Sequence, residues 1–88
     1  MSSRRLYVGG LLETTTTQHL RDLFAPFGTV EGVHIVLHKF TGKMAGYGFV
    51  EMDSEEHAIR AATALEGTQR DGMRLRTYVT PFAHQKST

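Results

Sequence analysis

Apolar and polar residues alternate in four short stretches of the chain, and this pattern predicts four β-strands. The stretches are residues 6–8, 30–37, 46–52 and 74–79. Gly9 and Gly10 follow the first stretch and Pro81 follows the last, as expected where strands end. Residues 38–45 form a polar connector between the second and third strands, which is short enough for a hairpin.

A helical repeat replaces the alternation between the first two strands. Leu20, Leu23, Phe24 and Phe27 recur at positions i, i+3, i+4 and i+7, which places them on one helix face. Thr16 and Thr17 are both suitable N-caps for this helix. Pro26 lacks a backbone N–H, so we expect it to distort the last turn.

A second helix is predicted between the third and fourth strands. Asp53 and Glu56 have the spacing of a capping box, with Asp53 as the N-cap. Gly67 is typical of a residue that ends a helix. The apolar residues of the predicted inner face are Ala58, Ile59, Ala62 and Leu65.

The resulting order, βαββαβ, predicts the α+β class and a ferredoxin-like sandwich. In this fold a four-stranded antiparallel sheet has both helices on one face. We expect the folded domain to span residues 4–81, with an N-terminal tail at 1–3 and a C-terminal tail at 82–88. The other face of such a sheet has no helix to cover it, so its side chains decide the function.

Strand alternation assigns three rings to this uncovered face. If Leu6, Val8 and Val50 point toward the helices, then Tyr7, Tyr47 and Phe49 point away from them. Exposed rings clustered on one surface are unusual unless a ligand covers them, and flat rings stack well on nucleic-acid bases. The side chains expected to flank the rings are His34, Arg74, Arg76 and Tyr78.

Composition changes this picture mainly by exclusion. The 88 residues have no Cys, so disulfides, thiolate metal sites and cysteine nucleophiles are excluded. The five His residues lack metal-ligand spacing, and the absence of Asn argues against an acylphosphatase-type enzyme. We therefore expect no catalytic residue, no metal and no cofactor. No apolar run is long enough to cross a bilayer, so we expect an intracellular protein without a membrane partner.

The charges are distributed unevenly although the net charge is only +1. All nine acidic residues and three basic ones lie in segments 13–31 and 51–71, which gives −6 there and +7 elsewhere. In the predicted fold the basic segments border the uncovered face. This distribution favours a polyanionic ligand on that face.

Two segments carry a family resemblance. Residues 6–11, Leu-Tyr-Val-Gly-Gly-Leu, and residues 45–52, Ala-Gly-Tyr-Gly-Phe-Val-Glu-Met, resemble the hexamer and octamer motifs of the RNA-recognition motif family. The resemblance implies single-stranded RNA binding, with bases stacked on Tyr7 and Tyr47 and with Phe49 against the sugars. We also expect RNA contacts from Arg5, His34, Lys39, Lys43, Arg74, Arg76 and Tyr78.

Four positions depart from the family pattern, namely Ala45, Met52, Arg70 and Thr77, and the first of them bears on RNA binding. Ala45 stands where the octamer motif usually has Lys or Arg, so a phosphate contact is missing, and Lys43 or Arg76 is expected to compensate. The loss of one basic contact predicts weaker binding with a shallower salt dependence.

Two functions follow from these observations. The first is non-catalytic binding of single-stranded RNA, sequence-tolerant to moderately specific and near micromolar, with single-stranded DNA bound more weakly. The second is a protein-interaction or dimerisation module that uses the same fold. We expect a monomer, with a weak dimer as the alternative. A role in post-transcriptional regulation would place it in the cytoplasm, as for small bacterial single-module proteins, or in the nucleus of a eukaryote.

Overall fold

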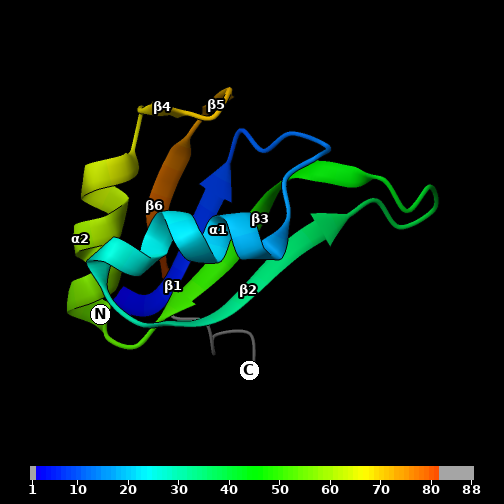
Figure 1. The fold of residues 1–88 in the computed structure, drawn as a ribbon. Coiled ribbons are helices and arrows are strands. Elements are labelled where there is room, and N and C mark those ends of the chain that lie inside the picture. The colour runs from blue at the N-terminus through cyan, green and yellow to red at the C-terminus, as the bar shows by residue number, and fades with distance from the viewer. Residues whose placement is uncertain (1, 82–88) are drawn as a thin grey trace.

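The sheet has the strand order β2-β3-β1-β6, and every neighbouring pair is antiparallel (Figure 1). This computed structural model describes residues 2–81. The four strands are β1 (Ser2–Gly9), β2 (Val30–Leu37), β3 (Met44–Met52) and β6 (Arg76–Pro81). Helices α1 (Thr17–Phe24) and α2 (Glu55–Leu65) cover one face. The predicted α+β, ferredoxin-like sandwich is confirmed.

Strand β1 begins earlier than predicted. The expected tail residues Ser2 and Ser3 belong to the strand, and Ser2 pairs with Pro81 of β6. The Ser3 hydroxyl donates to the Thr80 carbonyl at 3.1 Å. These contacts with β6 extend β1 to residues that lack the apolar alternation, and this is why the sequence pattern did not predict them. The predicted tail at 82–88 lies outside the described residues.

The ends of α1 follow the sequence signals. Thr16 is the N-cap, and its hydroxyl accepts the His19 N–H at 3.1 Å. After Phe24 the chain tightens into the 3₁₀ turn η1 (Ala25–Phe27), which contains Pro26. The predicted distortion by proline is therefore confirmed.

Helix α2 corrects two predictions. Its N-cap is Ser54, whose hydroxyl accepts the His57 N–H at 3.1 Å, because the predicted cap Asp53 directs its carboxylate to the His57 ring instead. Ile59 is not part of the buried face, since it is 46% exposed. The buried positions i, i+3, i+4 and i+7 are Ala58, Ala61, Ala62 and Leu65.

The segment after α2 is also more complex than the predicted strand at 74–79. A small hairpin pairs β4 (Gln69–Arg70) with β5 (Met73–Arg74) before β6 begins. Leu75 interrupts the strand because its N–H donates to the Thr68 carbonyl at 2.8 Å and its carbonyl accepts the Gly67 N–H at 2.9 Å. Arg74 therefore lies outside the four-stranded sheet.

The core fills the layer between the sheet and the helices. Its largest fully buried side chains are Phe24, Leu6, Leu20, Met52, Leu65, Met73, Leu75, Val8 and Val50. Each side chain of this size stabilises the fold by about 1.5–3 kcal/mol relative to exposure. Within residues 2–81, no helix is long and apolar enough to cross a membrane.

Candidate nucleic-acid interface

Four rings form a cluster on the face of the sheet that the helices leave uncovered. We call Tyr7, Tyr47, Phe49 and Tyr78 the ring platform. Tyr7 of β1 lies opposite Phe49 of β3 and opposite Tyr78 of β6. Its ring centroid is 4.9 Å from that of Tyr78 and 5.6 Å from that of Tyr47, with both pairs stacked, while Phe49 meets Tyr7 and Tyr47 edge-on at 6.1 Å. The structure thus brings together the three rings predicted from alternation and places Tyr78, which was expected to flank them, in direct contact with Tyr7.

A glycine sets the position of the central ring. A Cβ placed on Gly9 would lie 2.6 Å from the Tyr7 hydroxyl oxygen and 2.9 Å from Cε1 of the same ring. The Tyr7 ring therefore lies along its own strand, over the bare backbone two residues further on. This explains why the last residue of β1 is a glycine.

A shallow groove of about 400 Å³ lies beside the platform, between Phe49 and β2. The Arg5 guanidinium carbon lies 4.4 Å from the Phe49 ring centroid, so the predicted RNA contact Arg5 is held against a ring. His34, also predicted, is the cross-strand partner of Phe49. The groove is lined by Arg5, Gly32, Val33, His34, Phe49 and Glu51.

Acidic partners hold two residues from the predicted basic segments. Arg4 forms ion pairs with Glu31 at 2.8 Å and with Glu51 at 3.1 Å. Arg76, a predicted RNA contact, places its Nε 3.0 Å from a carboxylate oxygen of Glu66. The surface around the platform is therefore of mixed charge rather than uniformly basic, and Arg76 must leave or share Glu66 to reach a phosphate.

Glu66 is held by the sheet edge as well as by arginine. Its other carboxylate oxygen accepts the Thr77 N–H at 2.6 Å. This backbone hydrogen bond, together with the Arg76 guanidinium, lowers the pKa of Glu66 below its ordinary value. The carboxylate thus remains charged and occupies a donor on the open edge of β6.

The loop between β2 and β3 carries a residue that the sequence analysis missed. Phe40 is 91% exposed, and the Lys39 ammonium nitrogen lies 5.6 Å from its ring centroid. Lys43 is exposed in the same loop. The signal was available in the sequence, because an aromatic residue beside a lysine in a polar connector has no core to join.

Arg74 lies away from the platform, in the β4–β5 hairpin, where it pairs with Gln69. A Cβ on Gly10 would collide with the Arg74 carbonyl oxygen, so the end of β1 passes directly against this hairpin. The structure therefore places Arg74 at the end of the sheet and not among the rings.

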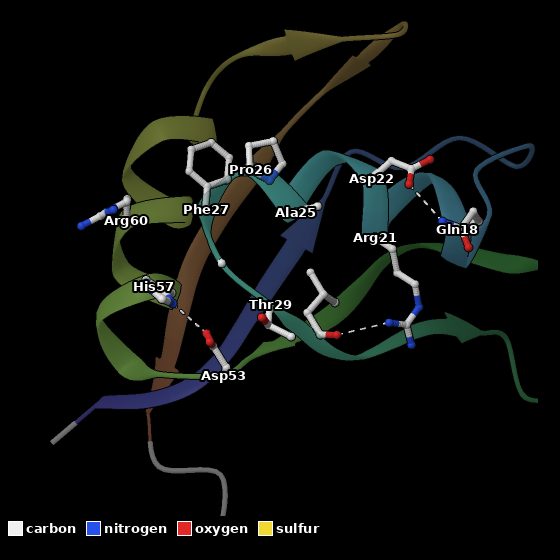
Figure 2. A pocket seen from close by; sticks show the side chains of 12 residues that line it. Gln18, Arg21, Asp22, Ala25, Pro26, Phe27, Thr29, Asp53, His57 and Arg60 are labelled. Atoms are coloured by element: carbon white, nitrogen blue, oxygen red, sulfur yellow. Dashed lines mark hydrogen bonds and ion pairs between the residues drawn. The ribbon is translucent and has the colours of Figure 1, made fainter.

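A larger cleft, about 740 Å³, lies at the other layer, around η1 and the start of α2 (Figure 2). We call it the helix-side cleft. Several of its polar side chains bind within the protein: Gln18 donates to Asp22 at 2.9 Å, and Arg21 donates to the Val30 carbonyl at 3.3 Å. His57 Nδ1 lies 2.7 Å from Asp53 Oδ1, and this hydrogen bond lowers the pKa of Asp53.

Comparisons with known proteins agree with this geometry. A glycine-rich mitochondrial RNA-binding protein 2 of Arabidopsis thaliana is 34% identical over 86% of this chain and 48% of its own. The mouse RNA-binding motif, single-stranded-interacting protein 2 is 41% identical over 77% of this chain and 18% of its own. This chain thus spans less than half the length of either relative.

A solved Sxl-lethal protein–RNA complex superposes with a TM-score of 0.79 and 29% identity, over 88% of this chain and 47% of that one. The family model described as RNA recognition motif matches residues 6–76, which include the whole ring platform except Tyr78. Because the match covers most of the chain and both aromatic strands of the motif, this chain belongs to the RNA recognition motif family.

Proposed function

We propose that this chain binds single-stranded RNA by stacking bases on Tyr7 and Tyr47, with Phe49 against the sugars, and that it catalyses no reaction. The observation that carries the proposal is the ring platform itself. Three of its rings lie on the two central strands, on the face that no helix covers. Rings in this position expose flat apolar surface that a base can bury.

The magnitudes are consistent with moderate affinity. Each base stacked on an aromatic side chain contributes about 1–3 kcal/mol. Two or three stacks with a few phosphate contacts give about −8 kcal/mol, which is a Kd near the micromolar range. Arg5, Lys39 and Lys43 supply the phosphate contacts, and Arg76 joins them when it separates from Glu66.

The proposed ligand is RNA in preference to DNA, and the proposed state is a monomer. A ribose lying against Phe49 presents its 2′-hydroxyl to the sheet, which favours RNA. The Glu66 carboxylate occupies the Thr77 N–H at the edge of β6, which opposes pairing of that edge with a second chain.

The test replaces both rings of β3. The double variant Tyr47→Ala/Phe49→Ala should lower the affinity for a short single-stranded RNA at least thirtyfold, because it removes two contacts of about 1–3 kcal/mol each. Fluorescence anisotropy with a labelled RNA hexamer measures the loss, and circular dichroism verifies the fold.

Ile59→Ala is the matched control, since it removes an exposed apolar side chain from α2 on the covered side. It should leave the RNA affinity unchanged. If the folded double variant bound RNA as tightly as the parent, the platform would be rejected. A protein-interaction role for this fold would then be the better reading.

A further inference from the structure

Glu51 is a carboxylate on a face proposed to bind a polyanion, and its position needs a reason. Its side chain is 47% exposed and lines the groove beside Phe49. An acidic group there repels phosphate, so its presence lowers non-specific affinity. Glu51 already pairs with Arg4, and a carboxylate on an RNA-binding surface can also accept hydrogen bonds from a base.

The two oxygens of this carboxylate have different surroundings. Oε2 lies 3.1 Å from an Arg4 guanidinium nitrogen, and the same guanidinium also holds Glu31 at 2.8 Å. Oε1 lies 4.0 Å from the point that a Cβ on Gly32 would occupy. Arg4 therefore fixes the carboxylate, and its second oxygen borders the open space above Gly32.

Gly32 makes that space. It is the cross-strand partner of Glu51, and a Cβ added there would meet nothing closer than 4.0 Å. No close packing therefore demands a glycine at this strand position. It lies where the pairing of β2 with β3 shifts register, and its missing side chain leaves the groove between β2 and Phe49 open. The volume of this groove, about 400 Å³, falls in the range of small-ligand sites.

The wall opposite Gly32 suits a flat ring. Arg5 is held on the face of Phe49 at 4.4 Å and also lines the groove. Guanidinium planes stack on unpaired bases, and single-stranded RNA exposes the Watson–Crick edges of its bases to side chains. A base lying against Arg5 can turn this edge toward Glu51.

We infer that the groove over Gly32 is a base-selecting subsite, in which Glu51 accepts a hydrogen bond from the exocyclic amine of adenine, cytosine or guanine and disfavours uracil. Uracil has a carbonyl oxygen where cytosine has its amine, so its only Watson–Crick donor is N3–H, and the carbonyl oxygens on both sides of that donor repel the carboxylate. The inference rests on the proposed RNA-binding function and adds to it a preference among bases.

Cytosine and uracil provide the sharpest comparison, because they share a ring size and differ at this edge. We expect the parent protein to bind hexacytidine about tenfold more tightly than hexauridine, since hydrogen bonds to charged groups contribute about 1.5–3 kcal/mol. Glu51→Gln should reduce the ratio to about twofold, because a glutamine amide can donate to uracil as well as accept from cytosine. Gly32→Val should reduce it similarly by filling the groove.

Glu31→Gln is the matched control, because it weakens the other ion pair of Arg4 without altering the groove, and it should keep the tenfold ratio. If the parent bound neither oligonucleotide, the proposed function would fail and the inference with it. Equal binding of both would overturn the inference alone. A ratio that survived in Glu51→Gln and in Gly32→Val would also overturn it.

Discussion

In the part of the chain that the structure describes, two aromatic side chains lie over a glycine, one on each layer. On the ring platform, Tyr7 covers Gly9, and in the helix-side cleft, His57 covers Gly28. In both cases an added Cβ would come within 2.6 Å of the side chain above it. The two regions differ in how the ring is held, since His57 is hydrogen-bonded to Asp53 whereas Tyr7 is flanked only by other rings.

This difference separates a structural contact from a binding surface. The helix-side cleft is the larger hollow, at about 740 Å³ against about 400 Å³. Several of its polar side chains nevertheless bind one another or the backbone: Gln18 with Asp22, Arg21 with the Val30 carbonyl, and His57 with Asp53 (Figure 2). The ring platform offers apolar faces that no helix covers. The volume of a cleft is therefore a poor indicator of the binding site in this protein. The type of side chain that remains exposed and unpaired is a better indicator.

The largest expected effect is on the cleft side. Gly28 has φ = 149°, which L side chains rarely adopt, and a Cβ there would lie 2.5 Å from His57 Nδ1. Gly28→Ala should lower the free energy of unfolding by about 1–3 kcal/mol and leave RNA affinity unchanged. Urea denaturation and RNA anisotropy measure the two quantities.

Gly67→Ala serves as the control for this change. Gly67 also has a positive φ, 75°, but nothing lies within 4 Å of its added Cβ. It should cost less stability than Gly28→Ala. Equal losses would show that the contact with His57 contributes nothing, and a loss of RNA affinity in Gly28→Ala would break the separation of the two layers.

The corresponding substitution on the ring platform, Gly9→Ala, should affect RNA affinity more than stability. Gly9→Ala displaces the Tyr7 ring, whose hydroxyl is at the flexible end of the side chain, so the stability cost is small. RNA affinity should fall five- to tenfold, which is about 1 kcal/mol of a base stack. A double-mutant cycle with Tyr7→Ala checks the cause. Independent, additive losses would show that Gly9 acts elsewhere than through Tyr7.

The comparison also shows what the sequence could predict. Period-two alternation placed Tyr7, Tyr47 and Phe49 on one face because every central-strand residue faces either the core or its opposite side. Thr77 of β6 is buried, with its hydroxyl donating to the Ala62 carbonyl, so the inner face of the edge strand also carries a polar side chain that has a partner. The alternation period and the order of the elements therefore suffice to assign strand residues to a face when the inner face is mostly apolar.

Several of the errors arose where polar side chains choose among several partners. Asp53 and Ser54 are both good N-caps, and the choice depended on the His57 ring, which no local rule reveals. The engagement of Arg4 by Glu31 and Glu51 is likewise invisible, because these residues are far apart in the chain. Segment charges predicted a basic surface, whereas pairing across strands decides which charges remain available.

A smaller effect tests the ion pair that holds Arg76. Glu66→Gln weakens the attraction at 3.0 Å and releases the guanidinium toward the platform. RNA affinity should rise about two- to threefold, and the slope of log K against log salt should steepen by up to about one, as for one added phosphate contact. Titrations at several salt concentrations measure the slope. An unchanged slope would mean that Arg76 contacts no phosphate.

The smallest expected effect concerns the cleft and pH. The hydrogen bond from His57 lowers the pKa of Asp53 below its ordinary value of 3.8. A carboxyl group with a lowered pKa stabilises the fold fully above its unfolded pKa, and this contribution disappears as pH falls through the lowered value. The stability advantage of the parent over Asp53→Asn should therefore be present at neutral pH and disappear as the pH drops below 3.8.

Urea denaturation of both proteins across this acid range measures the difference, and RNA affinity at neutral pH should be identical in the two. Because both partners are about one-third exposed, solvent screens the interaction and the difference should be small. If the advantage instead persisted unchanged below the lowered pKa, the Asp53 carboxylate would not be its source. If Asp53→Asn altered RNA binding, the helix-side cleft would be coupled to the ring platform. The cleft would then have more than the structural role that the His57–Gly28 contact indicates.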